Sequence, residues 1–200
     1  MSTINPPTTS SVEEFNARRR PKRADARRNY DKVVAAAREA FTERGAESSL
    51  EEIARRAGVG IGTLYRNFPN RQALLESVYV DELGEMCRSA ADLDTGDPFD
   101  ALRGWLRRFV DYMVTKQALA SELLNYVDRQ NPLFVDCRRA LFASGEPFLA
   151  RAQAAGVVRA DTDLAEIIQL FGQIAKIPAA DPAQIEHIFQ IALDGLRTRS

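Results

Sequence analysis

The sequence is poor in the residues on which catalytic and metal sites depend. Its 200 residues include one histidine and two cysteines, Cys87 and Cys137, which lie too far apart for a metal-knuckle or redox-motif spacing. The chain has no G-x-S-x-G motif and no phosphate-binding glycine loop, and no set of metal-ligating residues lies at ligand spacing around His187. These absences exclude the recognisable catalytic sets, so we expect neither an enzyme nor a metal or other cofactor.

Long apolar runs are missing as well. The longest strongly apolar run without a charge, residues 167–175, is nine residues long, which is about half of a membrane span. The first residues, MSTINPPTTSSVEEF, lack the basic start and the apolar core of a secretory signal. We therefore expect a cytoplasmic chain with no membrane partner, in which the two cysteines are small buried apolar residues.

The charge of the chain is unevenly distributed. The composition, 45% hydrophobic and 28% charged, is that of a globular protein. The net charge of -1 divides into +5 for residues 1–75 and -6 for residues 76–200. The densest basic tract, RRRPKRADARRN at residues 18–29, contains seven arginines and lysines. A basic first third favours contact of the N-terminal part with a polyanion, although a solvated basic tail has the same composition.

Apolar residues recur at helical spacing along most of the chain, and no strand-like alternation of useful length appears. Residues 1–16 are rich in Pro, Ser and Thr and are expected to be disordered. The spacing predicts helices over residues 30–41, 50–57, 61–68, 71–91, 99–113, 119–127, 133–143, 147–155, 164–175 and 182–196. Gly145 and Pro147 are expected to break or kink the helical pattern there. The sequence therefore predicts an all-α fold.

Residues 49–75, SLEEIARRAGVGIGTLYRNFPNRQALL, have the features that a helix-turn-helix needs. Ser49 and Glu52 form a capping box before a short helix, and Gly58 can adopt the left-handed conformation that reverses the chain. Ala54 is small enough for the next helix to cross close to its backbone. Asn70 can cap the long helix that follows. An ordinary helical hairpin with a glycine turn fits the same residues.

Within that stretch, the run I-A-R-R-A-G-V-G-I-G-T-L-Y-R-N-F-P-N-R-Q-A-L-L resembles the DNA-binding signature of TetR-type transcriptional regulators. The resemblance implies a basic N-terminal arm over residues 1–28 and a three-helix, helix-turn-helix DNA-binding domain over residues 29–75. It implies a helical effector-binding and dimerisation domain over residues 76–200. The C-terminal run from Gly156 to Arg197 is similar to a subgroup of these regulators.

By this resemblance, residues 61–68 are the recognition helix in the major groove. The residues at its leading edge can contact a thymine methyl group, approach bases through the backbone, or donate the Thr63 hydroxyl. These residues are Gly60, Ile61, Gly62 and Thr63. Tyr65 is expected to donate to a phosphate, with packing against the first helix as the alternative. Arg66 is expected to reach a phosphate or a guanine edge.

Further DNA contacts are implied on both sides of the recognition helix. Asn67 and Arg71 stand where the family often has histidine and lysine, and both side chains can still donate to phosphate. Ser49 combines its capping role with a phosphate contact. The basic arm either enters the minor groove or remains a solvated tail. Its residues are Arg18, Arg19, Arg20, Lys22 and Arg23.

The resemblance also implies a cavity for a small-molecule effector in the second domain. An aromatic-rich wall favours an apolar or aromatic effector, although a packed helical core explains the same residues. The expected wall residues are Met86, Cys87, Trp105, Phe109, Met113, Leu123 and Tyr126.

The last two helices carry more apolar residues than one buried face requires, such as Ile174 and Ile191 beside the main stripes. This surplus predicts a homodimer with an isologous four-helix interface, although both helices could instead be internal to one subunit. The expected interface residues are Ile168, Phe171, Ile188, Phe189 and Leu193.

Together these features favour a ligand-responsive, sequence-specific DNA-binding regulator. We expect a repressor that a small molecule releases from a palindromic operator in double-stranded DNA. One alternative is a constitutive or architectural DNA-binding protein without an effector, whose DNA affinity no ligand changes. Another is a helical binding protein whose DNA motif has no role, and which shows no sequence preference.

Overall fold

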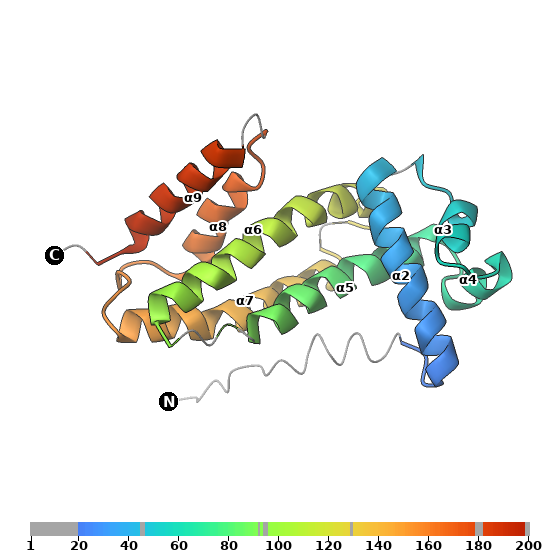
Figure 1. The fold of residues 1–200 in the computed structure, drawn as a ribbon, viewed down its shortest axis with the longest axis horizontal. Coiled ribbons are helices and arrows are strands. Elements are labelled where there is room, and N and C mark those ends of the chain that lie inside the picture. Colours follow the sequence, from blue (N-terminus) through green and yellow to red (C-terminus); the bar gives the residue numbers. More distant parts are fainter. Residues whose placement is uncertain are drawn as a thin grey trace. The chain divides into compact units, whose positions relative to one another are not determined.

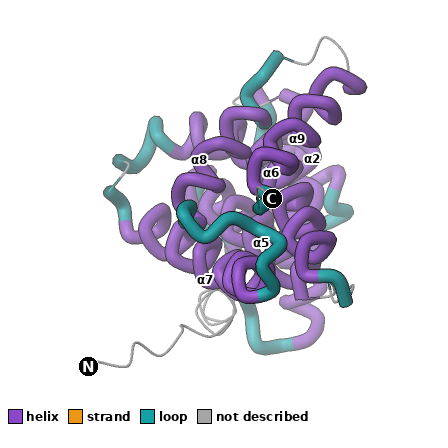
Figure 2. Tube along the Cα trace, turned by 90° about the vertical axis from the view of Figure 1, so that its left-hand side faces the viewer, coloured by secondary structure: helices purple, strands orange, loops and turns teal. Residues whose placement is uncertain are grey.

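The structure is a computed structural model that describes residues 20–44, 47–91, 93, 96–128, 130–178 and 182–198. The described residues form α-helices joined by loops and turns (Figure 2). This confirms the all-α fold. An isolated antiparallel bridge joins Val158 and Arg197. Among the described helices, none is long and apolar enough to cross a membrane. The segment expected to be disordered, residues 1–16, lies outside the described residues.

Figure 1 shows the helices in chain order. Their bounds are α2 (Ala24–Arg44), α3 (Leu50–Arg56), α4 (Ile61–Asn67), α5 (Arg71–Ala91), α6 (Pro98–Leu123), α7 (Pro132–Ala154), α8 (Leu164–Ile174) and α9 (Pro182–Leu196). The first helix begins six residues before the predicted start at Tyr30, because Ala24 and Ala26 are strong helix formers and Asp25 lies in the favourable first turn. Residues 24–28 are therefore helical and do not belong to an extended arm.

Helix α7 runs without a break through Pro147, so the first of the two expectations, a division into two helices, is wrong. Pro147 lacks the N–H that would bond one turn back, but the helix keeps buried residues on either side of it, Leu141 and Leu149. Gly145 serves packing here: a Cβ at this position would lie 2.5 Å from Cζ2 of Trp105. The two patterns expected over 99–113 and 119–127 likewise belong to one helix, α6.

The described chain divides into two compact units, each assembled from segments that are separated in the sequence. The N-terminal unit contains the described residues up to 85 together with residues 115–138, and the C-terminal unit contains residues 86–114 and the described residues from 139 on. Helices α5, α6 and α7 each contribute residues to both units.

Each unit has its own apolar core. In the N-terminal unit, Phe41 of α2, Ile53 of α3 and Leu64 of α4 are fully buried, and the ring of Tyr30 lies 4.8 Å from that of Phe68. These contacts pack the two short helices onto α2. In the C-terminal unit the core includes the parallel rings of Trp105 and Phe109 on α6 and the edge-to-face pair of Phe171 and Phe189, which joins α8 to α9. In both units these aromatic pairs lie in the interior.

Candidate DNA interface

Helices α3 and α4 are joined by a tight turn whose geometry follows from its residues. Ser49 is the N-cap of α3, and its hydroxyl oxygen accepts a hydrogen bond from the N–H of Glu52 at 3.1 Å. Gly58 has φ +64°, a conformation that favours glycine, and the next residue, Val59, donates its N–H to the carbonyl of Ala54. The predicted helix-turn-helix is thus formed, with the expected glycine at its reversal.

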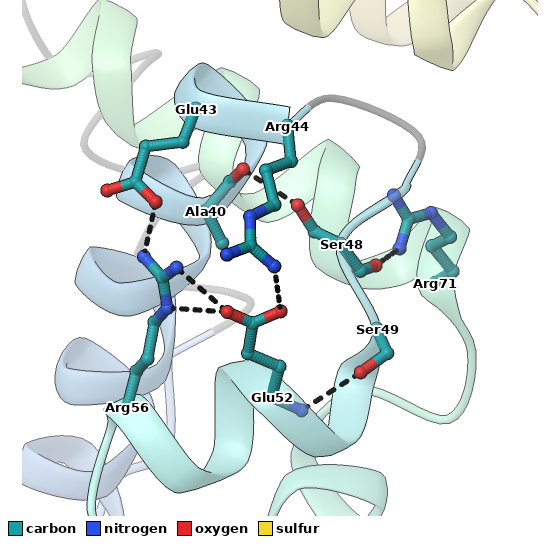
Figure 3. Close-up of polar contacts among 8 residues, drawn as sticks. All are labelled: Ala40, Glu43, Arg44, Ser48, Ser49, Glu52, Arg56 and Arg71. Atoms are coloured by element: carbon teal, nitrogen blue, oxygen red, sulfur yellow. Dashed lines mark hydrogen bonds and ion pairs between the residues drawn. The ribbon is translucent and has the colours of Figure 1, made fainter.

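A cluster of charged residues fastens α3 to α2 (Figure 3). Arg56 lies 2.8 Å from the carboxylates of both Glu43 and Glu52, and Arg44 lies 3.2 Å from Glu52. Hydrogen bonds from Arg56 hold the pKa values of Glu43 and Glu52 below the ordinary value of 4.5. The carboxylate of Glu52 therefore bonds to arginines, and only the Ser49 half of the predicted capping box is seen.

One face of α4 is buried and the other is open. Leu64 is fully buried, whereas Ile61 is 40% exposed and Tyr65 is 43% exposed. Arg66 is also exposed, and within the described part of the chain the side chains of Tyr65 and Arg66 make no hydrogen bond or ion pair. Tyr65 is therefore not buried against α2, which was the alternative for this residue. Its hydroxyl and the Arg66 guanidinium are available to an outside partner.

The other residues expected to contact DNA differ in their exposure and in the hydrogen bonds that they make within the chain. Gly60 and Gly62 are exposed, and a Cβ at either position would meet nothing within 4 Å. Thr63 is half-buried, and its carbonyl accepts a hydrogen bond from the side-chain amide of Asn67 at 2.9 Å. Ser49 is exposed although its oxygen caps α3. The structure brings all of these residues to α4 and to the start of α3.

Arg71 does not lie free at the surface, as a phosphate-binding residue would. Its Nη2 lies 2.6 Å from a carboxylate oxygen of Glu122, its Nη1 donates to the carbonyl of Ser48, and its guanidinium lies over the Phe41 ring. Ser48 is itself buried and donates to the carbonyl of Ala40 (Figure 3). The guanidinium is thus paired inside the N-terminal unit, and the phosphate contact expected of Arg71 stays a prediction.

In the described part of the basic tract, some side chains form ion pairs within the protein and others are exposed to solvent. Arg20 lies 2.8 Å from one carboxylate oxygen of Asp81, and Arg38 lies 2.8 Å from the other. Arg20 is therefore ion-paired with α5, and its expected contact with the minor groove stays a prediction. Lys22 and Arg23 are exposed and make no ion pair within the described residues. Arg18 and Arg19 lie outside the described residues.

Sequence reasoning missed the two carboxylates that hold these arginines. Asp81 and Glu122 are both buried, on the apolar faces of α5 and α6. A signal was present, because a carboxylate among buried apolar residues at helical spacing indicates a buried basic partner. The sequence could not identify the partners, which lie 61 and 43 residues away for Asp81 and 51 residues away for Glu122.

The residues expected to line an effector cavity are divided between the two units. Trp105 and Phe109 are fully buried in the C-terminal unit, and the Trp105 indole N–H donates to the hydroxyl of Ser144 at 3.3 Å. Met86 is buried, while Met113 is half-buried. Cys87 is also half-buried, and burial raises the pKa of its thiol. The other two residues of this set belong to the N-terminal unit, and one of them, Tyr126, is 46% exposed. In this structure Trp105 and Phe109 are core residues.

Helices α8 and α9 lie side by side (Figure 1) and bury most of the residues expected at a dimer interface. Phe171, Phe189 and Leu193 are buried inside the unit, and this part of the prediction is corrected. Ile168 and Ile188 are half-buried. The large apolar side chains on the open face are Leu170, which is 49% exposed, and Ile191, which is 58% exposed.

A hollow of about 490 Å³ lies on the same face of the C-terminal unit. Leu170 and Ile191 line it together with buried Ile167 and Leu196, and its polar lining comes from Arg159, Asp161, Thr162 and Glu166. An open apolar face of this kind on two helices is typical of a protein–protein contact. No group of three His, Cys, Asp or Glu residues that could hold a metal ion occurs among the described residues.

Comparisons with known proteins agree with this geometry. Residues 33–78 match the bacterial regulatory proteins of the tetR family, and residues 97–198 match the SbtR-like transcriptional regulator C-terminal domain. The chain is 38% identical to the TetR transcriptional regulator SCO0520 from Streptomyces coelicolor, with a TM-score of 0.73 over 86% of this chain and 99% of that one. It is 35% identical to the TetR transcription regulatory protein from Mycobacterium vanbaalenii, with a TM-score of 0.72 over 89% of this chain and 100% of that one. A comparison with curated protein sequences finds no match.

Proposed function

This chain belongs to the tetR family of bacterial regulatory proteins, and we propose that it binds specific sites in double-stranded DNA through the open face of α4. The observation that carries the proposal is the pair of Tyr65 and Arg66, a phenol and a guanidinium exposed on α4 with no partner inside the described chain. The Arg56 cluster holds the neighbouring helix on α2, so these two side chains are presented on a rigid support.

The proposed contacts divide into positioning and specifying ones. Tyr65, Ser49 and the exposed Lys22 and Arg23 suit phosphate contacts, which fix the register of a protein on the duplex without reading bases. The side chains of α4 that enter the major groove read base edges. Arg66 suits either role, since a guanidinium binds a phosphate or the O6 and N7 acceptors of guanine.

We propose that two copies of the chain bind a palindromic operator as a homodimer. The support is the open apolar face of α8 and α9 with Leu170 and Ile191, which a second copy would cover by isologous pairing. Two recognition helices related by a two-fold axis require half-sites whose centres lie about 34–36 Å apart, or a multiple of that distance. The operator should therefore read as an inverted repeat.

A small molecule bound in the C-terminal unit is proposed to lower operator affinity and so to relieve repression in the cytoplasm. Helix α5 supports this, because Arg71 at its start is bonded in the N-terminal unit and Met86 and Cys87 near its end belong to the C-terminal unit. A ligand changes DNA affinity only as far as it prefers the non-binding conformation, which typically amounts to about 1–3 kcal/mol of coupling. The aromatic content of the unit favours an apolar or aromatic effector.

Selection from a random pool of DNA duplexes tests the DNA-binding proposal. We expect enrichment of a symmetric motif, and a pool without a symmetric motif would refute the proposal. Arg66→Ala should weaken binding and either lower the salt dependence by about one phosphate contact or relax one base preference. The matched control is Arg103→Ala, an exposed arginine of the C-terminal unit, which should leave operator affinity unchanged.

The effector proposal has its own test. Trp105 is the only tryptophan of the chain and is fully buried, so its fluorescence reports on the C-terminal unit alone. Apolar and aromatic compounds that change this fluorescence are then tested for release of the operator. If every compound that binds leaves operator affinity unchanged, the effector proposal is wrong and the chain is a constitutive DNA-binding protein.

A further inference from the structure

Two glycines lie at the start of α4: Gly60 is its N-cap, and Gly62 is a residue of its first turn that no contact in the described chain requires to be glycine. Gly60 has φ -68°, and neither it nor Gly62 has the positive φ found at Gly58. A Cβ at either position would meet nothing within 4 Å, so packing inside the chain does not exclude a side chain. A glycine inside a helix is less favourable than an alanine, by roughly 0.5–1 kcal/mol. The open space over these two positions is therefore available for close approach by something outside the chain.

Ile61 lies between the two glycines and is the large side chain of this turn. It is 40% exposed, and the following turn on the same face carries the exposed Tyr65. An isoleucine has no hydrogen-bond donor or acceptor, so it cannot read the polar edges of bases. In the major groove the apolar group that bases present is the C5 methyl of thymine.

We propose that Ile61 reads a thymine methyl group in each operator half-site, and that Gly60 and Gly62 allow the backbone of α4 to approach the bases closely enough for this contact. The inference rests on the proposed function, because it assigns a specificity contact within the same DNA interface. The flanking glycines present hydrogen atoms where larger side chains would hold the helix away from the groove. Specificity at this position is therefore apolar and steric.

Deoxyuridine substitution tests the contact directly, because uracil differs from thymine only in lacking the methyl group. Each thymine of the selected operator is replaced singly, and the affinity of the full-length protein is measured. We expect one thymine in each half-site at which the replacement weakens binding about fourfold, the factor expected for burying one methyl-sized group. Replacement in both half-sites should then weaken binding about fifteenfold.

Ile61→Ala identifies the side chain that makes the contact. The variant should bind the thymine and uracil operators at that position with equal affinity. The matched control is Val135→Ala, which truncates another β-branched residue of the N-terminal unit with the same 40% exposure. This control should keep the wild-type fourfold preference for thymine. An Ile61→Ala variant that retains the full preference would overturn the assignment.

A methyl contact also has a distinctive salt dependence. Removing it releases no counterions, so the fourfold difference between thymine and uracil should be the same at low and high salt, whereas loss of a phosphate contact lowers the salt slope. A 5-methylcytosine at the same position should bind better than cytosine, because it restores the methyl group on a different base pair.

Gly62→Ala tests the close approach. We expect its melting temperature to equal or exceed that of the wild type, because alanine favours the helix and meets nothing in the chain, and its operator affinity to fall at least tenfold. Unchanged affinity would refute the role of the glycine. A symmetric operator whose thymines all tolerate uracil would refute this inference alone, whereas failure to select any operator would refute it together with the proposed function.

Discussion

Arg71 and Glu122 form an ion pair that joins the first residue of α5 to the end of α6, with 2.6 Å between Nη2 and Oε1 and a further hydrogen bond from Nε at 2.7 Å. The Glu122 side chain is only 7% exposed. The same guanidinium donates to the carbonyl of Ser48, the residue just before the N-cap of α3, and lies over the ring of Phe41 on α2. One side chain therefore links the entry to the helix-turn-helix with three longer helices of the N-terminal unit.

Removing the carboxylate of this pair should destabilise the protein strongly. Glu122→Ala leaves the Arg71 charge largely buried without its counter-charge, and breaking a buried pair in this way lowers the free energy of unfolding by about 3–5 kcal/mol. Glu122→Gln should have a smaller effect, because the amide oxygen can still accept from Arg71. Urea unfolding of the two variants and the wild type measures the difference. Equal stability of all three proteins would contradict the role of the pair.

Arg71→Lys separates this structural role from a phosphate contact. A lysine keeps the positive charge that a phosphate attracts but lacks the planar fork that bonds Glu122 and the Ser48 carbonyl together. We expect the lysine variant to lose stability, while the salt slope of operator binding, measured well below its melting temperature, stays as in the wild type. A stable Arg71→Ala variant whose salt slope falls by about one phosphate contact would restore the phosphate role.

Acid should weaken the attachment of α3 to α2. Hydrogen bonds from Arg56 lower the pKa of Glu52 in the folded protein below its ordinary value of 4.5, so the stabilisation by this pair is present above pH 4.5 and is lost as the pH falls through the lower, folded pKa. Glu52→Gln should therefore lower the melting temperature at neutral pH, and the difference from wild type should shrink in this acid window.

The neighbouring Glu51 provides the control for this pH dependence. It lies in the same first turn of α3, is exposed and makes no ion pair within the described part of the chain. Glu51→Gln should therefore change the melting temperature little at any pH. A Glu52→Gln difference that stays constant down to pH 2 would show that Arg56 does not act through the charge of Glu52.

The sequence predicted the elements whose signals are local. Asn70 accepts a hydrogen bond from the N–H of Ala73, as expected of the cap of α5, and α4 begins at Ile61 as predicted. These features depend on residues within one turn of each other, so a single stretch of sequence contains the whole cause. The DNA contacts expected of Tyr65 and Arg66 come from the family resemblance of the same short motif, and the structure leaves both side chains exposed.

Features that depend on distant partners were not predictable in this way. The sequence shows a glycine and a proline in α7, but the close packing at Gly145 comes from residues distant in the sequence, Trp105, 40 residues away, and Leu164 of α8. Likewise, periodicity identifies the apolar residues of α8 and α9 without showing which neighbour covers them. Phe171 and Phe189 cover each other within the unit, and this pairing leaves Leu170 and Ile191 outside.

Gly145→Ala tests the packing that allows α7 to continue. The added methyl would lie 2.5 Å from Cζ2 and 2.6 Å from Cη2 of Trp105, so the indole must move or the helices must separate. Overpacking of this kind lowers stability by about 1–3 kcal/mol. Because Trp105 is the only tryptophan, its emission should change together with the melting temperature. A variant with wild-type stability and emission would show that the residues around Gly145 can accommodate a methyl group without strain.

Substitution by aspartate should have different effects on folding at exposed and at buried positions of α9. Ile191 is 58% exposed and Leu193 is fully buried. Leu193→Asp buries an unpaired carboxylate and should unfold the C-terminal unit, whereas Ile191→Asp changes only the open face. If a second copy covers that face, Ile191→Asp should keep the helical content and the melting behaviour of a folded chain. In light scattering this variant should have the mass of a monomer, 22.3 kDa, whereas the wild type should have twice that mass.

The control for the interface is Val114→Asp, which places the same charge at a residue of the C-terminal unit that is 59% exposed on α6. It should remain a dimer, because Val114 is not on α8 or α9. Loss of the dimer should also weaken operator binding by about 100-fold or more, since a monomer contacts one half-site and loses the second, effectively intramolecular, binding event. A wild-type protein that runs as a monomer at micromolar concentration would refute the interface, and with it the reason for expecting an inverted repeat in the operator.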